Sequence, residues 1–244
     1  GEKEIDKAKK EIAHYTKCEQ AVRRASELYY RTLARKKFSA NPDIPSLQKF
    51  LRSGIKELQA LHKQTRSAEV LYFLKYLEMD FHQNEKKFQK AKDKCIELMD
   101  VILKNVSVYT HKRFDYALGN YVQCQIYDGR YSTALKFLLK QKYILPYSTD
   151  WYESREMELR ILFYQKKFTK AKALLDVMLK NIPDDMEPVR KARIQFFLAC
   201  VWFMLRDFKK AQSILNVNSE LFKDKSGWAV SIRMLELMLL AEQH

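Results

Sequence analysis

The amino-acid sequence predicts an all-α protein, a solenoid of stacked helix–turn–helix hairpins with about ten helices. The first supporting observation is a short box in which an aromatic residue is followed, three positions later, by alanine. The box occurs four times, with its aromatic at Phe88, Tyr131, Phe168 and Phe208. The intervals between these aromatics are 43, 37 and 40 residues. Self-similarity at periods of a few tens of residues is typical of proteins built from stacked repeats.

Two further observations argue against a β-rich fold. The chain of 244 residues contains only five glycines and five prolines, whereas all-β folds need many turns. No stretch alternates apolar and polar residues between two turn signals, which is the pattern of a half-buried strand. Long helices with short connections are the arrangement that remains.

The N-terminal part is predicted to contain two irregular helices on either side of a break. Residues 3–36 have apolar side chains at intervals of three and four, as one face of a helix does. Residues 41–45 contain two prolines and mark either a domain boundary or a decayed repeat. A second helix is expected over residues 46–63, and Gly54 weakens it by roughly 1 kcal/mol relative to alanine.

Residues 65–244 are expected to form the repeat array, after an irregular region over residues 1–64. Within the array a helix precedes each box, a short turn leads into the box, and a second helix follows. Asp150 and Asp184, each with a glutamate three residues later, are predicted to cap the first helices of the third and fourth hairpins. The final helix is expected over residues 227–243, where it would cap the stack.

The formal net charge is +15 at pH 7. An excess of this size favours acidic partners, nucleic acid or anionic membrane surfaces. The plainer interpretation is a solvated surface, which we favour because the basic residues are spread along nearly every helix. If the charge does serve binding, the expected partner is an acidic protein or peptide, with nucleic acid as the alternative.

The four cysteines are Cys18, Cys95, Cys124 and Cys200, and none belongs to a CxxC pair. Each lies in an apolar helical context, where a free thiol behaves as a small core residue. We therefore expect a reducing compartment, in the simplest case the cytoplasm.

The longest apolar run, residues 196–205, is half the length of a membrane span, so no membrane-spanning helix is expected. The first residues lack the apolar segment of a signal peptide. The sequence begins at Gly1, and it starts and stops inside helical patterns. We expect the chain to be one domain of a longer protein.

The boxes resemble the tetratricopeptide repeat, a 34-residue helix–turn–helix unit. In that family the second helix is marked by an aromatic, a small residue three later and a large apolar residue four further on. The four matching sets are Phe88, Ala91 and Cys95; Tyr131, Ala134 and Leu138; Phe168, Ala171 and Leu175; and Phe208, Ala211 and Leu215. The family's closing proline is matched by Pro146 and Pro183, but not by Leu103 or Lys223.

The resemblance covers residues 68–243 and identifies a divergent member of the tetratricopeptide-like helical superfamily. The first-helix pattern matches less well, and the intervals exceed the strict period of the family. The resemblance implies a right-handed superhelix and a non-enzymatic role as a protein–protein interaction scaffold, with a peptide or helix held in the concave groove.

Seven residues at the family's inner-face positions are the implied peptide-binding candidates. They are Tyr76, Asp80, Tyr116, Gln123, Tyr127, Glu156 and Arg160. Exposed aromatics on this face would act as anchors for a peptide. Core packing is the alternative, and it is the safer interpretation for most of the tyrosines on these helices.

Basic residues stand just before or inside each box, at Lys86, Lys87, Arg130, Lys166, Lys167, Arg206, Lys209 and Lys210. Equivalent turns of a solenoid line up along one edge, so these residues predict a basic edge. Nucleic acid or an acidic peptide would gain affinity there by releasing counterions. The nucleic-acid alternative also predicts exposed aromatics beside the basic turns, on which bases would stack. The plainer explanation is that exposed turns favour lysine for solubility.

No catalytic or cofactor site is indicated by the sequence. The five histidines are isolated, and no HExxH motif or other metal-ligand grouping occurs. No GxSxG motif or phosphate-binding loop is present either. We expect neither enzymatic activity nor a bound metal or cofactor.

Overall fold

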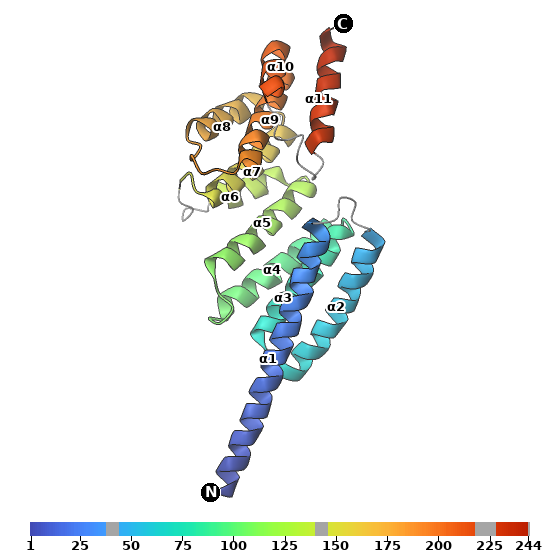
Figure 1. The fold of residues 1–244 in the computed structure, drawn as a ribbon, viewed down its shortest axis with the longest axis vertical. Coiled ribbons are helices and arrows are strands. Elements are labelled where there is room, and N and C mark those ends of the chain that lie inside the picture. The colour runs from blue at the N-terminus through green and yellow to red at the C-terminus, as the bar shows by residue number, and fades with distance from the viewer. Residues whose placement is uncertain (38–43, 140–145, 218–227, 244) are drawn as a thin grey trace. The chain divides into compact units, whose positions relative to one another are not determined.

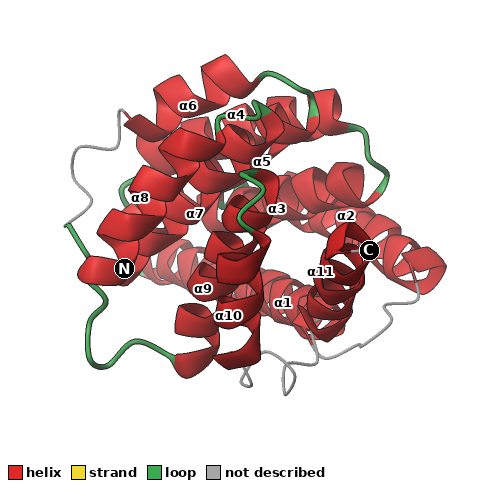
Figure 2. Cartoon of the chain, turned by 90° about the horizontal axis from the view of Figure 1, so that it is seen from above, coloured by secondary structure: helices red, strands yellow, loops and turns green. Residues whose placement is uncertain are grey.

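The computed structural model describes residues 1–37, 44–139, 146–217 and 228–243. In these ranges the chain forms eleven helices and no strand (Figure 1, Figure 2). The predicted all-α fold class is therefore confirmed, with one helix more than expected. The chain divides into two compact units, Gly1–Arg130 and Tyr131–His244.

The first unit contains five helices. They are α1 (Glu2–Lys37), α2 (Ile44–Thr65), α3 (Ala68–Asn84), α4 (Phe88–Lys104) and α5 (His111–Tyr127). Helix α3 is central, because α1, α2 and α4 all pack on it, and α4 in turn packs on α5 (Figure 1). Helices α2 and α3, on either side of the boundary expected between residues 64 and 65, pack together, and that boundary stays a prediction.

The second unit contains six helices. They are α6 (Tyr131–Leu139), α7 (Thr149–Tyr164), α8 (Phe168–Lys180), α9 (Pro188–Met204), α10 (Phe208–Val217) and α11 (Trp228–Gln243). Each helix from α6 to α10 packs on the next along the chain, and α11 contacts both α9 and α10.

The boxes lie at the helix contacts, as the sequence predicts. Helices α4, α6, α8 and α10 begin at the four box aromatics. The four box alanines, Ala91, Ala134, Ala171 and Ala211, are each 0% exposed. Ala171 belongs to the core cluster with Tyr152 and Leu159 of α7, and Ala211 belongs to the cluster with Phe196 of α9. A small side chain at this position lets two helices approach closely.

The turn inside each hairpin has one repeated backbone geometry. Lys86, Gly129, Lys166 and Arg206, each two residues before a box aromatic, have φ values of 57°, 73°, 56° and 62°. In the first turn, the amide of Lys86 donates to Gln83 O and the amide of Lys87 donates to His82 O. This pair of hydrogen bonds is a Schellman motif, which ends a helix through one residue in the left-handed conformation.

The helix starts differ from those predicted by the acidic pairs. Ser148 is the N-cap of α7 and accepts from the amide of Trp151, so Asp150 lies inside the helix rather than at its cap. Glu187 is the N-cap residue of α9 without a side-chain cap, and Asp184 lies in the preceding loop. The predictions for Asp150 and Asp184 were therefore wrong, because the Ser148 hydroxyl and Pro188 at the first helical position define these starts.

Gly54 has a packing role that its helix propensity did not indicate. It is buried in α2, and a Cβ added there would lie 3.1 Å from Leu77 Cδ2 of α3. Leu51 and Leu58, three residues before and four after it, are each 0% exposed. This is the spacing of the boxes, with Leu51 in place of the aromatic. In α2 the glycine therefore provides the close helix approach that alanine provides in α4, α6, α8 and α10.

Candidate interaction surfaces

Polar side chains connect the first helices of neighbouring hairpins. We call these residues the first-helix face: Glu69, Tyr76, Gln83, Arg113, Tyr116 and Asn120 on α3 and α5 of the first unit, and Glu153, Glu156, Arg190 and Arg193 on α7 and α9 of the second. At one end of the first set, Arg113 Nη1 donates to Glu69 Oε1 at 3.1 Å. At the other end, Gln83 Nε2 donates to Asn120 Oδ1 at 3.0 Å. These contacts link both ends of α3 to α5.

Two tyrosines lie between these contacts. The hydroxyl oxygens of Tyr76 and Tyr116 are 2.5 Å apart, and their rings stack with centroids 5.4 Å apart. Tyr76 is 0% exposed, whereas Tyr116 is 41% exposed. Burial, followed by the neighbouring Tyr116, raises the pKa of Tyr76 above its usual range. Tyr76 is therefore uncharged near neutral pH, and the stacked Tyr116 presents an aromatic surface to solvent.

In the second unit two glutamates of α7 pair with two arginines of α9. Arg190 Nη2 donates to Glu153 Oε1 at 2.8 Å, and Arg193 Nη2 donates to Glu156 Oε1 at 3.1 Å. Each pair is separated by 37 residues in the sequence. Glu156 is 8% exposed, and hydrogen-bonded charge pairs of this kind hold their side chains in fixed positions.

The seven predicted inner-face residues are divided by their burial. Tyr76, Asp80 and Glu156 are buried, so they do not offer exposed side chains to a ligand. Gln123 and Arg160 are partly buried. Tyr116 and Tyr127 are exposed at 41% and 53%. The structure brings Tyr76 to Tyr116, and it brings Glu156 to arginines of α9.

Sequence reasoning missed seven members of the first-helix face. They are Glu69, Gln83, Arg113, Asn120, Glu153, Arg190 and Arg193. The sequence of the second unit contained one signal. In both pairs an arginine follows the glutamate after 37 residues, which is one repeat. In the first unit the separations vary between 37 and 44 residues, so no fixed period indicates them.

The eight predicted basic residues of the turns are all exposed, and two tyrosines accompany them. Tyr127 and Tyr164 are the last residues of α5 and α7 and are 53% and 54% exposed. The Tyr127 ring lies 4.8 Å from that of Phe88 in the first unit. The Tyr164 ring stacks on Tyr131 at 5.3 Å in the second unit. Exposed aromatics thus stand beside basic turns in both units.

Several turn cations already have acidic neighbours. Lys87 Nζ lies 2.8 Å from Glu85 Oε2, Arg130 Nε lies 2.9 Å from Asp128 Oδ2, and Lys210 Nζ lies 2.7 Å from Asp207 Oδ2. The ammonium group of Lys210 also lies 4.3 Å from the centre of the Trp202 ring. These contacts reduce the positive charge that the turns present to a polyanion.

The first unit has an open cavity of about 330 Å³ lined by apolar and charged side chains. Ile55 of α2 and Phe81 of α3 belong to the apolar part of the lining. The charged side chains around it are Arg52, Lys56, Glu78 and Lys94, and His82 also lines it. Lys94 Nζ lies 3.2 Å from Glu78 Oε2 and 2.8 Å from Glu97 Oε1. The cavity therefore combines this paired lysine with the cations Arg52 and Lys56, a composition that suits an apolar side chain flanked by acidic residues.

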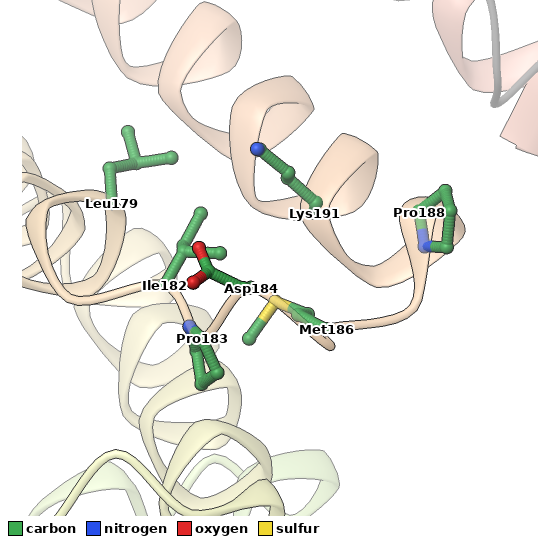
Figure 3. Close-up of a pocket in the computed structure, with 7 residues that line it drawn as sticks. All are labelled: Leu179, Ile182, Pro183, Asp184, Met186, Pro188 and Lys191. Atoms are coloured by element: carbon green, nitrogen blue, oxygen red, sulfur yellow. The ribbon is translucent and has the colours of Figure 1, made fainter.

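A second cavity, of about 470 Å³, lies at the connection between α8 and α9 in the second unit (Figure 3). Its lining includes one carboxylate, Asp184, and one ammonium group, Lys191, both exposed. Among the described residues, no group of three or more His, Cys, Asp or Glu side chains could hold a metal ion. None of the described helices has the length and apolar character needed to cross a membrane.

The cysteines are core residues or partly buried ones. Cys95 and Cys124 are 0% and 1% exposed, and Gln83 Nε2 lies 3.5 Å from Cys124 Sγ. Burial raises the pKa of Cys200 to about 12. A thiol with so high a pKa forms little thiolate and is a poor nucleophile at neutral pH.

Comparison with solved structures identifies the fold. The chain is similar to a putative kinesin light chain from Podosopora anserina with nearly identical TPR-like repeats, in two crystal structures. One of these, of a variant with a single substitution, is 11% identical, with a TM-score of 0.53, over 89% of this chain and 98% of that one. The other is 13% identical, with a TM-score of 0.51, over 87% and 96% of the two chains.

A third similar structure is BtubC (BKLC) from P. vanneervenii. It is 15% identical, with a TM-score of 0.51, over 82% of this chain and 86% of that one. No family model matches the sequence, and no curated protein matches it. The box aromatics, the buried box alanines and these structural similarities agree. The chain has a divergent TPR-like helical repeat fold.

Proposed function

We propose that the protein is a non-enzymatic scaffold that binds a peptide or helix of another protein on the first-helix face. The observation that supports this most directly is the mixed chemistry of that face in the first unit. Glu69 and Arg113 provide opposite charges, and Tyr116 provides an exposed ring held in place by Tyr76. Rigid aromatics beside oriented polar groups are typical anchors at protein interfaces. Fold alone gives only a class of function, so the face carries the argument.

The proposed partner is acidic. The net charge of +15 favours association with negatively charged proteins. The cavity between Arg52, Lys56 and Lys94 adds a local site of that character in the first unit. We place this function in the cytoplasm, because four cysteines without a disulfide suit a reducing compartment.

A displayed peptide library selected on the protein tests the proposal. Enriched peptides are then measured by titration calorimetry against wild type, Tyr116→Ala and the control Tyr30→Ala, which removes a tyrosine of α1 that is 64% exposed. Loss of a buried aromatic anchor costs about 1–2 kcal/mol or more, so we expect at least a tenfold weaker affinity for Tyr116→Ala alone. Equal affinities for all three proteins would place the site elsewhere.

A nucleic-acid-binding edge is the second candidate, because Tyr127 and Tyr164 stand exposed beside basic turns. The turn between α7 and α8 supports it best, since Lys166 and Lys167 have no acidic partner among the described residues. Binding of single-stranded RNA titrated from low to physiological salt tests it. The edge predicts a steep loss of affinity with salt and weaker binding by the double variant Lys166→Glu, Lys167→Glu. An equal effect of Lys9→Glu, Lys10→Glu on exposed α1 would reveal nonspecific attraction instead.

A further inference from the structure

The cavity of about 330 Å³ in the first unit belongs to a surface that the first-helix face does not include. Helices α2 and α4 both pack on α3, and the lining of the cavity comes from all three. Residues 44–104, which carry these helices, are described without a gap. The cavity is therefore a feature of three consecutive helices inside the unit.

The cavity lies on the opposite side of α3 from the first-helix face. Tyr76 and Gln83 are seven residues apart on one side of α3, and both donate to or accept from side chains of α5. Successive residues of an α-helix are about 100° apart, which places Glu78, Phe81 and His82 at about 140–240° from Tyr76. A ligand in the cavity would thus contact α2, α3 and α4 and leave the side of α3 that faces α5 free.

Part of the cavity lining is apolar and open to solvent. Ile55 and Phe81 are both half-buried. The guanidinium carbon of Arg52 lies 5.5 Å from the centre of the Phe81 ring. Burial lowers the pKa of His82, although Glu85 opposes the shift, so this imidazole is uncharged at neutral pH. A large apolar side chain of a ligand would therefore meet an aliphatic side chain, an aromatic ring and a neutral imidazole.

The carboxylates around the cavity are already paired with lysines. Lys75 and Lys94 each pair with both Glu78 and Glu97, at distances between 2.7 and 3.2 Å. Glu85 pairs with Lys87 at 2.8 Å. These contacts balance three carboxylates against three ammonium groups, so any further cation at the cavity gives it a net positive charge.

Three further cations are present, Arg52 and Lys56 on α2 and Lys90 on α4. All three are exposed, and within the described part of the chain none of them forms an ion pair with a carboxylate. Arg52 and Lys56 both line the cavity and are four residues apart, which places them on one side of α2. Lys90 is one of the cations that lower the pKa of His82, so its charge acts on the same cavity.

We propose that this cavity binds one large apolar side chain of an acidic segment in a partner protein, with carboxylates of that segment beside Arg52, Lys56 and Lys90. The match of charge gives the contact its specificity, and the apolar lining gives the inserted side chain its anchor. Glu78 and Glu97 would repel a continuous row of phosphates, whereas a segment with a few carboxylates avoids them. The site adds a second contact to the proposed scaffold, and it does not depend on binding at the first-helix face.

A synthetic peptide with one leucine between two pairs of glutamates tests the site. Its binding is followed through the amide NMR spectrum of the labelled protein, at low and at physiological salt. We expect the shifted amides to lie in α2 and α3 around Ile55 and Phe81. Alanine in place of the leucine should weaken binding roughly tenfold. Glutamine in place of the glutamates should also weaken it and remove its dependence on salt. No binding of the glutamate peptide at low salt overturns the proposal.

A matched pair of charge reversals locates the peptide. Arg52→Glu with Lys56→Glu should weaken binding roughly tenfold, because two attractive contacts become repulsive. Lys9→Glu with Lys10→Glu makes the same change in net charge on exposed α1 and should bind like wild type. Circular dichroism checks that both variants are folded. Equal losses in the two variants overturn the proposal, because they show attraction to the overall charge.

Two further outcomes separate this site from the other surfaces. Tyr116→Ala should leave the binding of this peptide unchanged. A loss caused by Tyr116→Ala, with none caused by the reversal of Arg52 and Lys56, would move the peptide to the first-helix face. That result overturns the cavity site and leaves the proposed function standing. Single-stranded RNA that binds more tightly than the peptide, and is lost on the same reversal, would assign these cations to nucleic acid and also overturn the proposal.

Discussion

The left-handed residue of the hairpin turns is glycine in one turn and a basic residue in the other three. Gly129 adopts φ of 73° without strain, whereas Lys86, Lys166 and Arg206 adopt similar values with a Cβ present. A non-glycine residue in this region costs roughly 1–2 kcal/mol. Three of the four turns therefore carry a basic residue at a conformational cost.

This difference gives a prediction with a matched pair of variants. Gly129→Ala should lower the free energy of unfolding by about 1 kcal/mol, although nothing lies within 4 Å of the added Cβ. Lys166→Gly should raise it by up to about 1 kcal/mol, reduced by the greater freedom of glycine in the unfolded chain. Urea unfolding measures both. Changes of the same sign would show that the φ values do not determine these effects.

His82 gives a residue-level prediction for pH. Burial, with the cations Lys87, Lys90 and Lys94 nearby, lowers the pKa of His82, while Glu85 opposes the shift. A histidine with a lowered pKa in the folded state binds its proton better when unfolded, so its contribution to stability is present above pH 6.5 and is lost as the pH falls below that value. His82→Gln should therefore lose less stability than wild type between about pH 7.5 and 5.5. The other four histidines are the same in both proteins, so an identical pH dependence would contradict the shift.

At the scale of the helix, the box alanine is the position where size matters most. Ala171 is 0% exposed in the core cluster between α7 and α8. Ala171→Leu should overpack this contact and cost about 1–3 kcal/mol. Ala173→Leu, two residues along on the exposed side of the same helix, is the control and should change stability by less than about 0.5 kcal/mol. Thermal unfolding that shows equal effects would place the helix contact elsewhere.

The second helices were predictable from sequence because each box contains both the start of the helix and the residues that make its contacts. The first helices were less predictable. Their N-caps are the hydroxyl residues Ser67, Thr110 and Ser148. Each is a single residue that is not part of a recognisable sequence motif. Gly54 was interpreted by its helix propensity, whereas its tight contact with Leu77 depends on tertiary packing. Local patterns predict elements well, and contacts between elements only where a repeat period links them.

The candidate site shows the same limit. The basic turns were predictable because they lie next to the boxes. The first-helix face was not, because the partners of Tyr76 and Glu156 are side chains about one repeat away whose register depends on how α3 meets α5 and how α7 meets α9. Asp80 was a candidate for exposure on this face and is 1% exposed.

At the scale of the molecule, a TPR-like fold provides rows of helices, and function depends on which row is exposed and how it is charged. The first-helix face combines opposite charges with an anchored tyrosine, whereas several turn cations are already paired. These two surfaces lead to different partners, and the protein-binding scaffold follows from the first.

Hydrogen exchange of the protein with and without a selected peptide tests this central claim most directly. The account predicts slower exchange of amides in α3 and α5 on binding, and that the Tyr116→Ala variant loses this protection while Tyr30→Ala keeps it. Protection confined to the turns before α4 and α8, with α3 and α5 unchanged, would contradict the first-helix face as the binding site.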